Sequence, residues 1–200
     1  MQIIPRKCAG MRYFAAGTAV LMVTTAALAG CKPTAGTKLE PAPAAAATLV
    51  PCGDAGYLRG QLYGAIPVSL DWGSTDLNCE GMPRPSGRGA RLRFASVAAG
   101  GDLQLAIIIA IPDLERDAAG RELASNVTVI EEGGGRFFST SDLGNCLTDI
   151  TILEELDVDA DRYSIGGKLY CVSPLAEING DSSVLIPELA FLGLVDWNSS

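Results

Sequence analysis

Histidine is absent from this 200-residue chain, so the side chain that most often acts as a general acid or base near neutral pH is missing. Its absence excludes Ser-His and Cys-His nucleophile pairs and zinc sites built on imidazole. The six cysteines include no C-x-x-C pair. We therefore expect no metal centre and no cofactor, and we expect that the protein is not an enzyme.

Long apolar runs are also missing. The longest covers residues 13–28, and about sixteen residues fall short of the roughly 20 that a transmembrane helix needs. Arg6, Lys7 and Arg12 precede the run, and small residues follow it. A basic start, an apolar stretch and a small-residue site in this order predict a signal peptide for export over residues 1–30.

The motif Leu28-Ala29-Gly30-Cys31 closes this segment and resembles the lipobox of bacterial lipoproteins. The resemblance implies that signal peptidase recognises Leu28, Ala29 and Gly30 and cleaves before Cys31. It also implies a diacylglyceryl group on the Cys31 sulfur and a fatty acid such as palmitate on the new amino terminus. Each buried methylene adds ~0.8 kcal/mol of membrane affinity, so two or three chains form a durable anchor. An ordinary cleaved signal with a chance cysteine is the alternative.

The residue after the lipobox bears on location. In enterobacterial lipoproteins an Asp at this position retains the protein at the inner membrane, whereas this chain has Lys32. The resemblance therefore implies a lipid anchor in the outer membrane, with the domain facing the periplasm or the cell surface. The expected partners are the membrane, through the lipid on Cys31, and a protein of the envelope.

Basic residues are scarce beyond the signal peptide. Residues 31–200 contain twelve Lys and Arg against twenty-three Asp and Glu, a formal charge of −11. Such a surface repels nucleic acid and anionic head groups. We expect no nucleic-acid partner, and we expect attachment by lipid alone.

Large apolar side chains are rare in residues 31–50, which also contain Pro33, Pro41 and Pro43. Such a stretch cannot bury enough surface to offset its ordering entropy, so it predicts a flexible Ala/Pro-rich tether after the lipidated Cys31. The remaining residues, 51–200, have the size of one ordinary domain.

Four cysteines lie in this domain: Cys52, Cys79, Cys146 and Cys171. An even number in an exported domain predicts two disulfides, although four cysteines allow three pairings. Proximity in the sequence favours Cys52 with Cys79 and Cys146 with Cys171. In the chain-entropy model, a disulfide that closes a loop of this length raises the free energy of unfolding by ~3 kcal/mol.

Apolar residues in this domain alternate with polar ones, as where Leu92 and Phe94 alternate with Arg91 and Arg93. Residues 102–111 are almost wholly apolar and predict a central strand that is buried on both faces. Residues 112–125 predict either a short helix or an ordered loop. We expect a mainly β fold, an antiparallel β-sandwich or barrel-like domain with at most one short helix.

Three glycines follow Glu131 and Glu132 and separate two apolar stretches, residues 126–130 and 136–140. Because glycine supplies the positive φ that tight turns need, this pattern predicts a hairpin. A phosphate-binding loop is the alternative, but no G-K-[ST] sequence follows the glycines.

Carboxylates crowd into a short stretch of the last third: Asp149, Glu154, Glu155, Asp157, Asp159 and Asp161. The spacing of Asp157, Asp159 and Asp161 is similar to the start of a calcium loop, but Arg162 replaces the expected Gly and Lys168 the expected Glu. These three residues are therefore weak calcium candidates. A solvated acidic hairpin loop is the main interpretation, and glycosidase-like catalysis is a further alternative.

Four arginines form the opposite cluster: Arg84, Arg88, Arg91 and Arg93. In so acidic a chain they either remain solvated, pair with the acidic stretch, or bind a carboxylate or phosphate of a partner.

Together these features predict a membrane-anchored lipoprotein of the cell envelope that is a non-enzymatic binding or assembly module. The alternatives are a carboxylate-based hydrolase of envelope glycan and a calcium-dependent adhesion module, both of which would use the acidic stretch.

Overall fold

The computed structural model describes Cys52 and residues 55–86, 88–97, 103–157 and 161–199. These residues belong to one compact unit, Ala46–Ser200, and their regular structure consists of strands alone. Nowhere in these ranges is there a helix with the length and apolar character needed to span a membrane. The expected mainly β, antiparallel fold is confirmed. The strands are β1 (Tyr57–Gly64), β2 (Val68–Trp72), β3 (Leu77–Pro83), β4 (Ala90–Ser96), β5 (Leu105–Ile111), β6 (Leu123–Glu131), β7 (Arg136–Ser139), β8 (Cys146–Asp157), β9 (Arg162–Cys171), β10 (Leu175–Glu177), β11 (Ser183–Leu185) and β12 (Leu189–Asp196).

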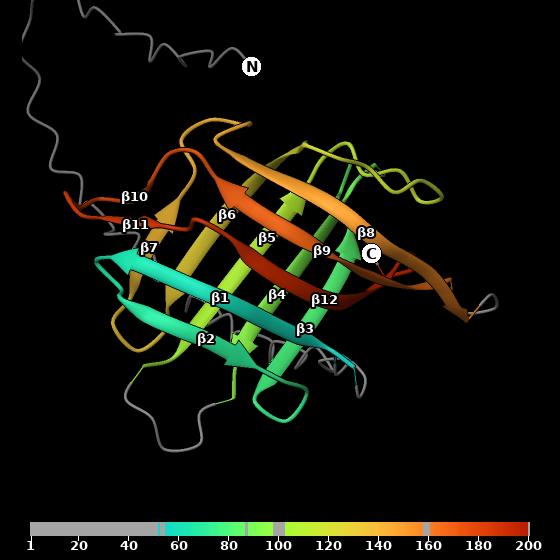
Figure 1. Cartoon of the computed structure of the whole chain (residues 1–200), viewed down its shortest axis with the longest axis horizontal. Coiled ribbons are helices and arrows are strands. Elements are labelled where there is room, and N and C mark those ends of the chain that lie inside the picture. The colour runs from blue at the N-terminus through green and yellow to red at the C-terminus, as the bar shows by residue number, and fades with distance from the viewer. Residues whose placement is uncertain (1–51, 53–54, 87, 98–102, 158–160, 200) are drawn as a thin grey trace, which may run out of the picture. The chain divides into compact units, whose positions relative to one another are not determined.

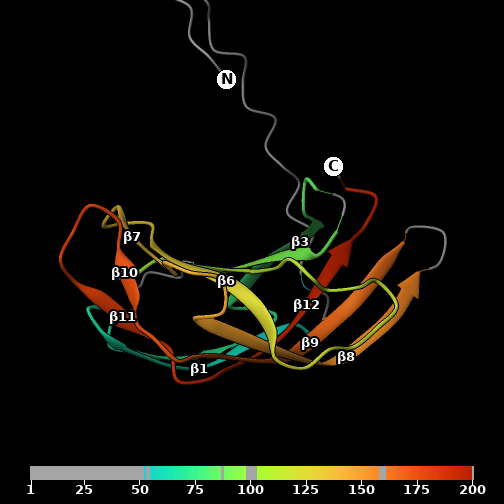
Figure 2. The same cartoon turned by 90° about the horizontal axis from the view of Figure 1, so that it is seen from above.

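The strands form two facing layers that are parts of one hydrogen-bonded sheet (Figures 1 and 2). One layer has the order β2-β1-β12-β9-β8, and the other has β3-β4-β5-β6-β7. Strand β6 belongs to both, because its first residues pair with β8 and the rest pair with β5 and β7. Strands β10 and β11 link β7 to β1 and close one side (Figure 2).

The core lies between the layers and follows the predicted alternation. Leu92 and Phe94 of β4 are fully buried, whereas Arg91 is exposed on the opposite face. Strand β5 is central, as expected, between β4 and β6. Its outer face is less buried than predicted, because Ile108 lies between Arg93 and Thr128 and is only half-buried.

Two glycines let the layers approach closely. A Cβ atom at Gly81 of β3 would overlap the carbonyl oxygen of Leu194, and one at Gly193 of β12 would lie 3.1 Å from the ring of Phe94. Beside them, the rings of Phe94 and Phe191 pack with their centroids 5.8 Å apart. The absence of side chains at Gly81 and Gly193 thus brings β12 against β3 and β4.

Residues 112–122 form an ordered loop and residues 123–125 are the start of β6, so the helix alternative is wrong. Two backbone groups of this segment bond to β8. The carbonyl of Gly120 accepts from the Ile150 amide at 2.8 Å, and the Glu122 amide donates to the Asp149 carboxylate at 2.7 Å. The hairpin at the three glycines is confirmed, with Glu131 opposite Arg136.

Both favoured disulfides are confirmed: Cys52 with Cys79, and Cys146 with Cys171. Cys52 precedes β1 and is bonded to β3, so the start of the described chain is attached to the opposite layer. The predicted signal peptide, the lipobox with Cys31 and the tether lie outside the described residues.

Candidate ligand-binding pocket

A pocket of about 730 Å³ lies where three loop segments meet. The first is the connection between β3 and β4, the second follows β5, and the third follows β12 at the end of the chain. Antiparallel pairing brings the first two together, because Ala90 at the start of β4 is the partner of Ile111 at the end of β5.

Backbone contacts fix these two loops against each other. Gly89 has a φ of 76°, which favours glycine, and a Cβ atom there would overlap the carbonyl oxygens of Ile111 and Pro112. The Arg84 amide donates to the Gly89 carbonyl at 3.1 Å and closes the hairpin loop. Pro83 and Pro112 further restrict the two backbones. The two loops are therefore held in a defined arrangement.

The floor of the pocket is apolar. Leu114 is only 3% exposed and belongs to the core, and Met82 and Trp197 are half-buried beside it. The Trp197 amide donates to the Asp161 carbonyl at 3.1 Å, which attaches the chain end to the β8-β9 hairpin. The buried indole N–H of Trp197 has no acceptor among the described residues.

The rim of the pocket carries charges of both signs. Arg84 and Arg88 form what we call the arginine wall, on the β3-β4 loop. Asp113 and Glu115, on the segment after β5, form the acidic wall. Within the described parts of the chain, none of these four side chains forms an ion pair within 4.0 Å.

A third arginine of the pocket is already neutralised. Arg116 forms an ion pair with Asp161, and its guanidinium lies 5.7 Å from the centre of the Tyr163 ring. This contact joins the segment after β5 to the β8-β9 hairpin. Arg116 therefore supports the pocket, whereas Arg84 and Arg88 are available to a ligand.

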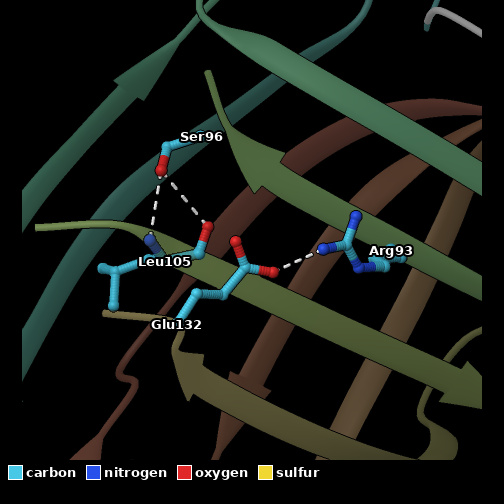
Figure 3. A network of polar contacts seen from close by, with 4 residues as sticks. All are labelled: Arg93, Ser96, Leu105 and Glu132. Atoms are coloured by element: carbon cyan, nitrogen blue, oxygen red, sulfur yellow. Dashed lines mark hydrogen bonds and ion pairs between the residues drawn. The ribbon is translucent and has the colours of Figure 1, made fainter. Parts of the chain in front are cut away.

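The predicted arginine cluster divides between two places. Arg84 and Arg88 line the pocket, whereas Arg91 and Arg93 lie on the outer face of β4. Arg93 forms an ion pair with Glu132 at 2.5 Å, near the hydroxyl of Ser96, which accepts from the Leu105 amide at 3.1 Å (Figure 3). Among the described residues, neither Arg93 nor the arginine wall pairs with the acidic stretch.

The acidic stretch lies in the β8-β9 hairpin, but four of its six carboxylates belong to strand β8 and not to the solvated loop that we expected. Glu154 and Glu155 are exposed on β8, Asp157 ends that strand, and Asp161 pairs with Arg116. Asp159 lies outside the described residues. Among the side chains that the structure describes, no three cysteines or carboxylates gather into a group that could hold a metal ion.

Asp149 lies at the other end of the hairpin, near Tyr170 of β9. Burial raises the pKa of the Tyr170 hydroxyl above its usual value of 10.0, and the negative charges of Glu122 and Asp149 raise this pKa further. In the turn between β6 and β7, the hydrogen bond to Glu131 raises the pKa of Arg136.

Sequence reasoning missed Trp197 and the acidic wall. Their roles depend on which strands are neighbours, and alternation within a strand does not reveal that. The pairing of β4 with β5 was the available signal, because it would place the loop before Ala90 beside the loop after Ile111.

No family model, no curated protein and no solved structure matches this chain. The chemistry of the pocket therefore follows from its own residues, which offer apolar contact and charges of both signs.

Proposed function

We propose that the protein is an exported lipoprotein of the bacterial envelope, held on a membrane by lipid on Cys31, and that its domain works by binding and not by catalysis. One observation carries the proposal. The four cysteines of the domain bond to one another, and a sulfur forms only one disulfide. The cysteines of the domain are thus all paired with one another, which supports a separate role for Cys31 as the acylated residue.

The two disulfides of the domain agree with export to an oxidising compartment. Disulfides persist in oxidising surroundings such as the periplasm and the cell surface, and they are rare in the cytosol. The basic and apolar segment before Cys31 provides the route of export. Lys32 after the lipobox favours the outer membrane.

The pocket supports a binding role. Ligand sites in proteins are usually concave and largely apolar, with a few polar groups that orient the ligand. The pocket has this composition, with Leu114 and Trp197 in its floor and charged side chains on its rim. The chain also contains no histidine for acid-base chemistry.

Labelling with a clickable palmitate analogue tests the anchor in cells. The unmodified chain and a Cys8→Ser variant should both become labelled, because Cys8 leaves with the signal peptide. A Cys31→Ser variant should carry no label. Label that persists in Cys31→Ser, or an unlabelled parent chain, would contradict the proposal.

A further inference from the structure

We propose that the pocket binds a short peptide in its zwitterionic form, an inference that rests on the proposed binding function and names its ligand. The terminal carboxylate of the peptide would contact the arginine wall, and its terminal ammonium the acidic wall. An apolar side chain between the two termini would pack on Leu114 and Trp197.

The charges carry the first step. Six ion pairs join described residues, and none of them uses the arginine wall or the acidic wall. A guanidinium group matches a carboxylate with two parallel hydrogen bonds, and a carboxylate likewise accepts strongly from an ammonium group. Each wall therefore has unused capacity for a charge of the opposite sign.

The separation of the walls carries the second step. Both walls line one pocket, yet no guanidinium of Arg84 or Arg88 lies within 4.0 Å of a carboxylate of Asp113 or Glu115. The fit of Gly89 against Ile111 and Pro112 fixes the two loops in this arrangement. A ligand that carries both charges can bridge the gap, whereas a simple anion or cation would leave one wall unpaired.

Size and floor chemistry point to a peptide. The volume of about 730 Å³ lies in the range of ~300–1,000 Å³ that is typical of small-ligand sites. An extended peptide of about three to five residues spans ~10–18 Å and carries its two charges at opposite ends.

The experiment uses the purified full chain in detergent and four versions of the peptide Ala-Leu-Leu-Ala. One has free termini, one is acetylated, one is amidated and one is blocked at both ends. Isothermal titration calorimetry should show that the free peptide binds and that each block weakens binding about tenfold or more, the loss expected for a hydrogen bond to a charged group. No binding, or an affinity that depends on only one terminus or on neither, would overturn the proposal.

Variants assign each terminus to its wall. Arg84→Gln with Arg88→Gln should abolish the effect of amidation and keep the effect of acetylation. Asp113→Asn with Glu115→Gln should abolish the effect of acetylation and keep the effect of amidation. If the variant that lacks the charges of one wall still loses affinity when the corresponding terminus of the peptide is blocked, the assignment is overturned.

Matched controls change the same charge away from the pocket. Arg91→Gln with Arg121→Gln, and Asp76→Asn with Glu155→Gln, alter exposed residues that do not line the pocket. Both should leave the affinity unchanged, and an equal loss in them would overturn the pocket as the site.

Two further readouts locate the peptide and separate this inference from the proposed function. Trp72→Phe leaves Trp197 as the single indole of the chain, so the fluorescence of Trp197 should change when the free peptide binds. An unchanged spectrum would contradict the placement of the peptide.

Mass spectrometry of the recovered peptide tests catalysis. An intact peptide supports the binding role, and a cleaved peptide overturns the binding role while peptide recognition stands. If no peptide binds and Cys31 is still acylated, the peptide inference fails and the anchor stands.

Discussion

Cys146 and Cys171 stand directly opposite each other across β8 and β9 and are joined by a disulfide, with their Cα atoms 4.0 Å apart. The other disulfide has a different setting. Cys52 lies before β1 and is bonded to Cys79 in β3, a strand whose partner within the described residues is β4 alone. One bond thus reinforces a strand pair, and the other attaches the chain that precedes β1 to the facing layer.

Removing either disulfide should lower the free energy of unfolding by a similar amount. The separations of 25 and 27 residues give similar loops, and the chain-entropy model assigns each about 3 kcal/mol. Urea denaturation of Cys146→Ala with Cys171→Ala, and of Cys52→Ala with Cys79→Ala, measures both. Variants as stable as the parent chain would show that the disulfides do not restrain the unfolded state.

A methyl group at Gly81 should force the two layers apart locally. Gly81→Ala is expected to lower the free energy of unfolding by about 1–3 kcal/mol, the usual effect of overpacking a core. Gly133→Ala is the matched control, because a Cβ atom there meets nothing within 4 Å, and its effect should stay within about 0.5 kcal/mol. Equal stability of the two variants would contradict the close approach of β3 to β12.

The rings of Phe94 and Phe191 should be energetically coupled across the core. A double-mutant cycle with Phe94→Leu and Phe191→Leu should give a coupling energy of about 0.5–1.5 kcal/mol. Phe138 is equally buried but forms no ring contact with Phe191 in the described part of the chain. The same cycle with Phe138→Leu should therefore be additive within about 0.5 kcal/mol, and a larger coupling in this control would argue against a specific ring pair.

Stability should fall at alkaline pH partly because of Tyr170. Its pKa is raised in the folded state, so folding favours the neutral hydroxyl. The resulting stabilisation is complete below the unfolded pKa of about 10 and is lost as the pH rises through the higher folded pKa. Thermal unfolding from pH 9 to pH 11 should show a smaller loss in Tyr170→Phe than in the control Tyr63→Phe. An equal loss of stability in the two variants over this pH range would contradict the raised pKa of Tyr170.

Local sequence patterns predicted much of the fold. Leu92 and Phe94 alternate with arginines, and they face the core. Three glycines after Glu132 mark the turn between β6 and β7. In both cases the determining interactions lie within one strand or one hairpin, where periodicity and turn chemistry decide the structure.

The pocket depends on contacts that local patterns do not contain. Arg84 and Asp113 come together because β4 pairs with β5, and Trp197 joins them because Gly81 lets β12 approach β3. The sequence of residues 112–122 did not decide between a helix and a loop for the same reason, because Gly120 and Glu122 bond to residues of β8.

Mass spectrometry of the mature amino terminus tests the central claim most directly. The lipoprotein account predicts a chain that begins at Cys31, with a diacylglyceryl thioether on its sulfur and a fatty acyl group on its amino terminus. A chain that retains Met1 with an unmodified Cys31, or one that begins beyond residue 31, would contradict the account.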